Sequence, residues 1–134
     1  MNTFLSRIEE DLRTAQISGP MGIYSKAAES WIEGSGHGDP DDFEGQYVLS
    51  LPGRLHALHG ADDGGPSPTE IMNEVQDWVT DEIGRGWPEL LDETGQFLAI
   101  LTPSIDSAFG AAWVGAGVSI PVGSLTQWKD RIRA

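Results

Sequence analysis

The clearest pattern of apolar and polar positions runs from Ser67 to Gly84, where it predicts an amphipathic helix. Ser67 and Glu70 have the spacing of a capping box, and Pro68 suits the first helical position. Gly84 is typical of a residue that ends a helix. Apolar residues recur at intervals of three or four and predict one buried stripe: Ile71, Val75, Trp78 and Val79.

A row of acidic residues follows the same helix, here called the acidic ridge: Glu70, Glu74, Asp77 and Asp81. At 100° per residue the ridge points roughly 140° away from the apolar stripe, so we expect it to face solvent. It is about 16 Å long, a length in which one strand of a nucleic-acid duplex carries about five phosphates. The four carboxylates therefore approach the charge density of a nucleic acid.

Further helices are predicted mainly from the spacing of apolar residues, with fewer capping residues to mark their ends. Apolar residues at helical spacing indicate one helix over residues 3–17 and a short one over 24–31, with a brief strand at 21–24 as the alternative. Trp87-Pro88 is typical of the start of a short helix through residue 93. Ser124 and Gln127 form a second capping box, which predicts a C-terminal helix.

The remaining apolar runs predict strands. Residues 46–51 alternate in the manner of a strand, and 97–101 is the most apolar run, which predicts a buried strand. Residues 111–122 are rich in small and β-branched side chains and predict one or two strands. We expect 102–107 to be a turn region, while 54–59 fits either a helical face or a second hairpin strand.

These elements predict a fold class of α+β, with four or five helices packed on a small, mostly antiparallel sheet, because strands and helices do not alternate regularly. A length of 134 residues predicts a single domain, residues 1–134.

Charge gives the strongest functional signal. The chain has 21 acidic and 8 basic residues, a formal net charge of −13, which disfavours direct binding to nucleic acid or to an anionic membrane. Residues 27–84 hold 13 acids and a single base, Arg54. Two predicted loops carry acids that would widen the ridge if they lie beside it: Asp39, Asp41, Asp42, Glu44, Asp62 and Asp63.

The histidines offer a different hypothesis. His56 and His59 are three residues apart, and His37 with the acids of the second loop would complete a metal site. The pair lacks the HExxH pattern, and no P-loop, dinucleotide fingerprint or nucleophile elbow is present. A small metal-dependent hydrolase that uses His56 and His59 is therefore the alternative function. The main prediction is a protein that is no enzyme and binds no cofactor.

The tryptophans divide into two groups. Trp31, Trp78 and Trp128 lie on predicted apolar stripes and are expected in the core. Trp87 and Trp113 have no such assignment, so we expect one of them to anchor an interface, because tryptophan is favoured at binding hot spots.

Together these features predict a small acidic inhibitor that blocks a basic, nucleic-acid-handling protein partner. In size, charge and lack of catalytic motifs the chain is similar to anti-CRISPR proteins of phages and to toxin-immunity proteins. The charge density of the acidic ridge suggests that this protein acts as a nucleic-acid mimic. Without cysteine, a signal-peptide pattern or a long apolar run, we expect a cytoplasmic protein without membrane contact. A structural or assembly component, in which an apolar patch drives oligomerisation, is a further alternative.

Overall fold

The computed structural model describes residues 3–36, 39–42, 46–58, 66–106 and 110–133. Within these residues it contains two α-helices and three short 3₁₀-helices. The α-helices are α1 (Phe4–Leu12) and α2 (Pro68–Ile83). The 3₁₀-helices are η1 (Arg13–Ala15), η2 (Pro40–Asp42) and η3 (Leu125–Trp128).

In the described segments, nine strands form three antiparallel sheets. The first has four strands in the order β2-β1-β3-β4: β1 (Gly22–Ser25), β2 (Ser30–Gly34), β3 (Tyr47–Leu51) and β4 (Arg54–Leu58). The second pairs β5 (Glu89–Leu91) with β6 (Phe97–Ile100). The third has the order β7-β8-β9: β7 (Thr102–Asp106), β8 (Gly110–Gly115) and β9 (Val118–Pro121).

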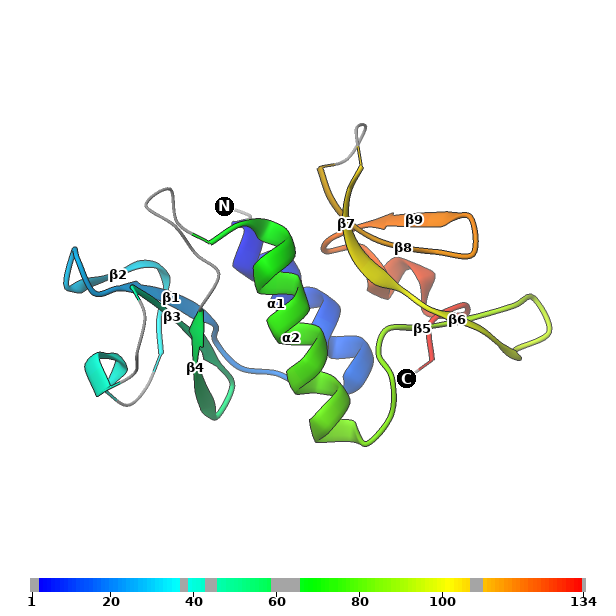
Figure 1. The fold of residues 1–134 in the computed structure, drawn as a ribbon. Helices are drawn as coiled ribbons and strands as arrows, with labels where there is room; N and C mark the ends of the chain where they lie inside the picture. Colours follow the sequence, from blue (N-terminus) through cyan, green and yellow to red (C-terminus); the bar gives the residue numbers. More distant parts are fainter. Residues whose placement is uncertain (1–2, 37–38, 43–45, 59–65, 107–109, 134) are drawn as a thin grey trace.

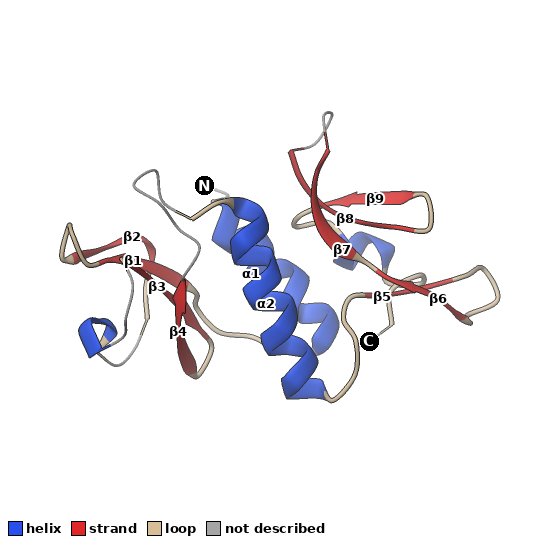
Figure 2. Ribbon diagram, in the orientation of Figure 1, coloured by secondary structure: helices blue, strands red, loops and turns tan. Residues whose placement is uncertain are grey.

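The helices run through the middle of the molecule. The four-stranded sheet lies on one side of them and the two smaller sheets lie on the other (Figure 1). In Figure 2, strands (red) lie on both sides of the two central helices (blue). Buried residues of both helices and all three sheets belong to one hydrophobic core, including Leu12, Leu49, Val75, Leu90 and Trp113.

The prediction of four or five helices on a small sheet is therefore wrong. The part of the chain that the structure describes is mostly β, with two α-helices and three antiparallel sheets of four, two and three strands. The predicted helix over 24–31 is a hairpin, in which Tyr24 of β1 lies opposite Trp31 of β2 with their rings 5.4 Å apart. Their spacing suits one helical face, but it also suits two strands joined by a tight turn, which is what the chain forms.

The other helix errors have a nonlocal cause. Residues 89–91 form β5, because β6 pairs with one edge of this segment while Arg131 and Arg133 hydrogen-bond to the other. The C-terminal capping box produces only the four residues of η3. The Ser124 side chain makes no capping hydrogen bond, and the Leu125 N–H donates instead to Asp11 on α1.

The helix that the sequence predicts best is α2, and its predicted ends are confirmed. Ser67 accepts a hydrogen bond from the Glu70 N–H at 3.2 Å, and Gly84 ends the helix in the left-handed region with φ of 74°. The predicted apolar stripe is buried together with Met72. The predicted helix at the start of the chain is confirmed as α1 and η1.

The strand predictions are confirmed in part. The segment 46–51 corresponds to β3, the segment 111–122 forms two strands, and the ambiguous segment 54–59 contains β4. The predicted strand at 97–101 forms as β6, but it is not buried. Two of its residues, Phe97 and Leu98, are 59% and 44% exposed. The prediction of a turn at 102–107 is wrong, because β7 occupies most of that segment.

Candidate functional site

The acidic ridge lies on α2, but its four carboxylates are not equivalent. Asp77 and Asp81, toward the C-terminal end of the helix, are exposed. Glu70 accepts a hydrogen bond from the Ser67 hydroxyl at 3.2 Å, and Glu74 Oε2 lies 3.7 Å from His56 Nδ1 on β4. The first half of the ridge is thus engaged within the protein, and the second half is available to a partner.

The His56 side chain extends from β4 of the four-stranded sheet to Glu74 on α2. Its side chain is 19% exposed. Burial and, to a smaller extent, the positive charge of Arg54 lower the pKa of His56, so the imidazole is neutral at pH 7 and its contact with Glu74 is not an ion pair. The other members of the suggested metal site, His37, His59, Asp62 and Asp63, lie outside the described residues. Within the described part of the chain, no three histidine or acidic side chains gather in a way that would hold a metal ion.

The acids of the first predicted loop form a separate patch. Asp39 and Asp41 are exposed at η2, where the Asp41 N–H donates to Asp39 Oδ1 at 3.1 Å. In Figure 1, η2 lies beyond the four-stranded sheet as seen from α2, so these two acids do not extend the ridge. Asp42 belongs to η2, but its side chain is outside the description, as are Glu44, Asp62 and Asp63.

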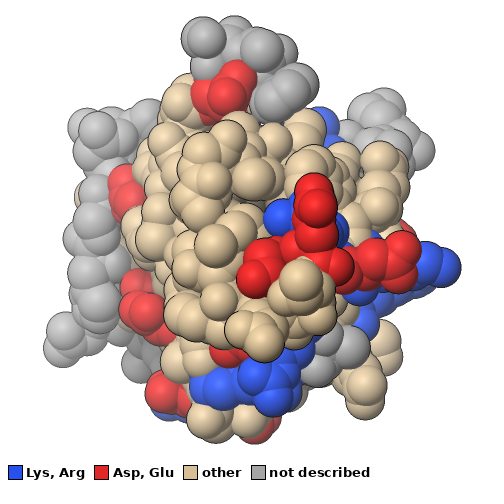
Figure 3. Space-filling view, turned by 90° about the vertical axis from the view of Figure 1, so that its right-hand side faces the viewer, with Lys and Arg blue, Asp and Glu red and all other residues tan. Residues whose placement is uncertain are grey.

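The uneven charge of the sequence distinguishes two segments that form different parts of the fold. Residues 20–84, which include the four-stranded sheet and α2, hold 13 acids and two bases. Residues 85–134, which include the smaller sheets, hold five acids and four bases. Figure 3 shows this second side, where acidic and basic side chains lie next to each other beside a broad uncharged surface.

Among the described acids of residues 20–84, six are exposed, and we call them the acidic surface: Glu29, Asp39, Asp41, Asp77, Asp81 and Glu82. Glu33 is only partly exposed to solvent, and its Oε1 accepts a hydrogen bond from the Leu5 N–H of α1 at 3.0 Å. Next to Glu33 on β2, Ile32 is 53% exposed. The acidic surface therefore includes an apolar side chain that a partner can cover.

The two tryptophans expected to anchor an interface lie inside the protein instead. Trp87 is 1% exposed and Trp113 is 0% exposed, and their rings pack edge to face with centroids 5.2 Å apart. The Trp87 indole N–H donates to Thr14 Oγ1 at 2.9 Å, and the Trp113 indole N–H donates to Asp11 Oδ2 at 3.0 Å. Neither ring presents a surface to a partner, so this prediction is corrected.

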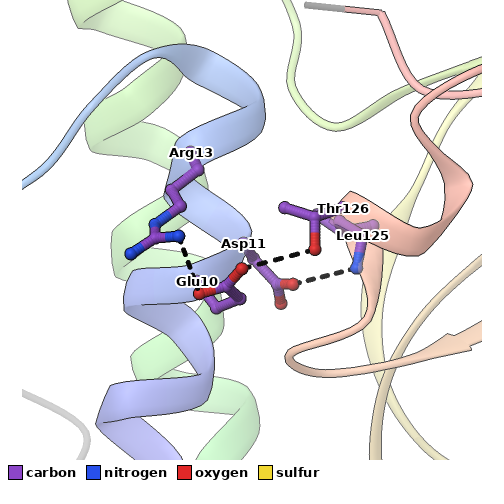
Figure 4. Close-up of polar contacts among 5 residues, drawn as sticks. All are labelled: Glu10, Asp11, Arg13, Leu125 and Thr126. Atoms are coloured by element: carbon purple, nitrogen blue, oxygen red, sulfur yellow. Dashed lines mark hydrogen bonds and ion pairs between the residues drawn. The ribbon is translucent and has the colours of Figure 1, made fainter.

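Asp11 is a buried carboxylate that the sequence analysis missed. It accepts hydrogen bonds from the Trp113 indole and from the backbone N–H groups of Gly123 at 2.8 Å and Leu125 at 3.0 Å. Figure 4 shows Asp11 on α1 directed toward Leu125. Burial raises the pKa of Asp11 to about 6, and the three N–H donors oppose that rise. A helical wheel gives the missing signal, since Asp11 lies only about 60° from buried Ile8.

The outer side of α1 forms a polar groove with η3. The cavity has a volume of about 450 Å³ and is lined by Ser6, Arg7, Glu10, Gly123, Thr126 and Gln127. Glu10 contacts Arg13 at 3.5 Å and the Thr126 hydroxyl at 3.5 Å (Figure 4). The Ser6 hydroxyl donates to the Thr3 carbonyl at 2.8 Å. A serine whose proton is engaged by a carbonyl is not arranged for attack with a neighbouring base.

Comparison with protein-family models, with curated proteins and with solved structures found no match. Of the helices in the described segments, none combines the length and the hydropathy needed to cross a bilayer.

Proposed function

We propose that this protein is a small cytoplasmic inhibitor, not an enzyme, whose acidic surface binds a basic partner that handles nucleic acid. The observation that carries the proposal is the uneven distribution of charge, with 13 acids and two bases in residues 20–84, the segment that includes the four-stranded sheet and α2. A surface of one sign attracts a partner of the other sign and raises the rate of encounter. Grooves that bind the phosphates of nucleic acid are lined by lysine and arginine, so they carry the positive charge that complements this surface.

The exposed carboxylates of α2 are the best-defined part of this surface. Asp77 and Asp81 sit on a rigid helix that is capped at both ends and buried along its other face. Their positions are therefore fixed before binding, which reduces the entropy lost on association. Ile32 gives the surface an exposed apolar contact of the kind found within polar rims.

The test is an elution experiment. Polyanion-binding proteins of the source cells are retained on heparin and then treated with the purified protein at about 50 mM and about 300 mM salt. We expect the protein to release a basic nucleic-acid-binding protein at the lower salt concentration and much less of it at the higher one, because salt screens charged surfaces.

A matched pair of variants makes the test specific. Asp77→Lys with Asp81→Lys changes the net charge by the same amount as Glu93→Lys with Asp130→Lys, and all four residues are exposed. The first pair lies on α2, and the second lies on the side of the smaller sheets. The proposal requires the α2 variant to lose elution while the other variant retains it. Equal elution by both variants would mean that the charge of α2 serves only solvation.

A further inference from the structure

Strand β6 is an open sheet edge. Among the described strands its one neighbour is β5. The opposite edge of β5 is covered by the C-terminal segment, where the Leu91 N–H donates to Arg131 O at 2.7 Å and the Arg133 N–H donates to Glu89 O at 3.0 Å. The protein thus completes one side of this sheet with its own chain and leaves the side of β6 without a described strand.

The sequence of β6 does not protect that edge. Edge strands usually carry a charge or a proline that hinders pairing with another chain. Such residues occur on the other described edge strands, β2, β4, β7 and β9: Glu33, Arg54, Pro103 and Pro121. β6 reads Phe-Leu-Ala-Ile, with Phe97 59% exposed and Leu98 44% exposed.

The distribution of charge favours a second copy of this chain as the occupant. Residues 85–134 are nearly neutral, with five acids and four bases, so two copies can approach through this side with little repulsion (Figure 3). Contact through Ile32 on edge strand β2 would bring two strongly acidic sides together, and edge strand β7, which exposes Ile105, contains Pro103. Pairing through β6 keeps the acidic surfaces at opposite ends of the dimer.

We propose that two copies of the chain associate through β6, with each β6 strand antiparallel to its counterpart across a two-fold axis. The Leu101 N–H donates to Pro88 O at 2.9 Å, on the side of β5. The register of the β5–β6 pair shifts here, since Ala99 pairs with Leu90 and Phe97 pairs with Leu91, which leaves Leu98 without a partner residue on β5. We therefore place Leu98 at the axis, and the pairing joins the two copies of this sheet into one. This inference does not depend on the proposed function.

The first test measures the molar mass by light scattering over a concentration series up to about 1 mM, which detects even weak association. We expect the mass to double with concentration. Phe97→Lys places a charge on the edge and keeps the protein monomeric, whereas Ile105→Lys, at a residue that is equally exposed at 59% on β7, leaves the doubling unchanged. A monomer at every concentration would overturn the inference, as would loss of the dimer in Ile105→Lys alone.

The second test is a cross-link. The chain contains no cysteine, so a single introduced cysteine can form a disulfide only with another copy. Leu98→Cys places the two thiols across the axis, where opposed residues lie about 5.5 Å apart, within the range of a disulfide. Mild oxidation should give a covalent dimer. Ile32→Cys, which is 53% exposed on β2, should stay monomeric under the same conditions. Equal cross-linking of both variants would indicate random collision and contradict the pairing.

Discussion

Replacing Asp11 by asparagine tests which of two opposing forces controls its carboxyl group. Burial favours the neutral form, whereas hydrogen bonds from Trp113, Gly123 and Leu125 favour the ionised form. The rise in the pKa from 3.8 to about 6 means that burial prevails. At about 1.4 kcal/mol per pKa unit, ionising Asp11 in the folded protein costs about 3 kcal/mol of stability.

The sign of the pH dependence follows from proton binding. Between pH 3.8 and about 6 the folded state binds more protons at Asp11 than the unfolded state does, so this group's contribution to stability falls as pH rises. Asparagine does not titrate. Relative to Asp11→Asn, the wild type should therefore lose about 2–3 kcal/mol of unfolding free energy between pH 4 and pH 7.

The assay is denaturant unfolding of both proteins at several values of pH, read as the difference in unfolding free energy. An asparagine amide nitrogen cannot accept the N–H bonds that one of the two Asp11 oxygens accepts, so we expect Asp11→Asn to be the less stable protein at pH 4. The difference should shrink by about 2–3 kcal/mol by pH 7. Asp11→Ala, which leaves three N–H donors without their acceptor, should be destabilised by about 3–5 kcal/mol. A wild type that gains stability relative to Asp11→Asn as pH rises would refute the reasoning, because it would show that the hydrogen bonds outweigh burial.

Three further predictions concern α2 and its neighbour β4, each measured as unfolding free energy. Gln76→Ala should lower the unfolding free energy by about 2–4 kcal/mol, because the amide donates to the carbonyls of Trp87 at 3.0 Å and Leu101 at 2.6 Å. As a control, Asn73→Ala at an exposed position of the same helix should change it by less than about 0.5 kcal/mol. Ser67→Ala should cost about 1 kcal/mol by removing the N-cap, and a neutral result would contradict the capping role. The lowered pKa of His56 means that its contribution to stability is lost as pH falls below 6.5, because the unfolded state then binds the proton more readily. His56→Gln should remove that loss, and an unchanged pH profile would count against it.

Local signals explain why α2 was predictable. Its cap, its apolar stripe and its terminal glycine all lie within 18 residues of sequence and agree with one another. The hairpin that contains Tyr24 and Trp31 was mispredicted, because the same spacing serves a helical face and a pair of strands. No local pattern distinguishes these two outcomes when the segment is short.

In the candidate site, too, some features could be predicted from the local sequence and others depend on long-range contacts. Exposure of Asp77 and Asp81 followed from the helical periodicity alone. The engagement of Glu74 depends on where β4 places His56, and the role of Asp11 depends on Trp113, which is 102 residues away in the chain. The burial of Trp113 likewise reflects long-range packing, which residue type and spacing do not reveal.

The central claim is that the acidic surface binds a basic partner, and the association rate with the protein eluted from heparin tests it most directly. The rate constant should fall steeply as salt increases from about 50 to about 300 mM for the wild type and for Glu93→Lys with Asp130→Lys. For Asp77→Lys with Asp81→Lys it should be at least about tenfold lower at the lower salt concentration and depend less on salt. Identical rates and salt dependences for the wild type and both variants would contradict the account.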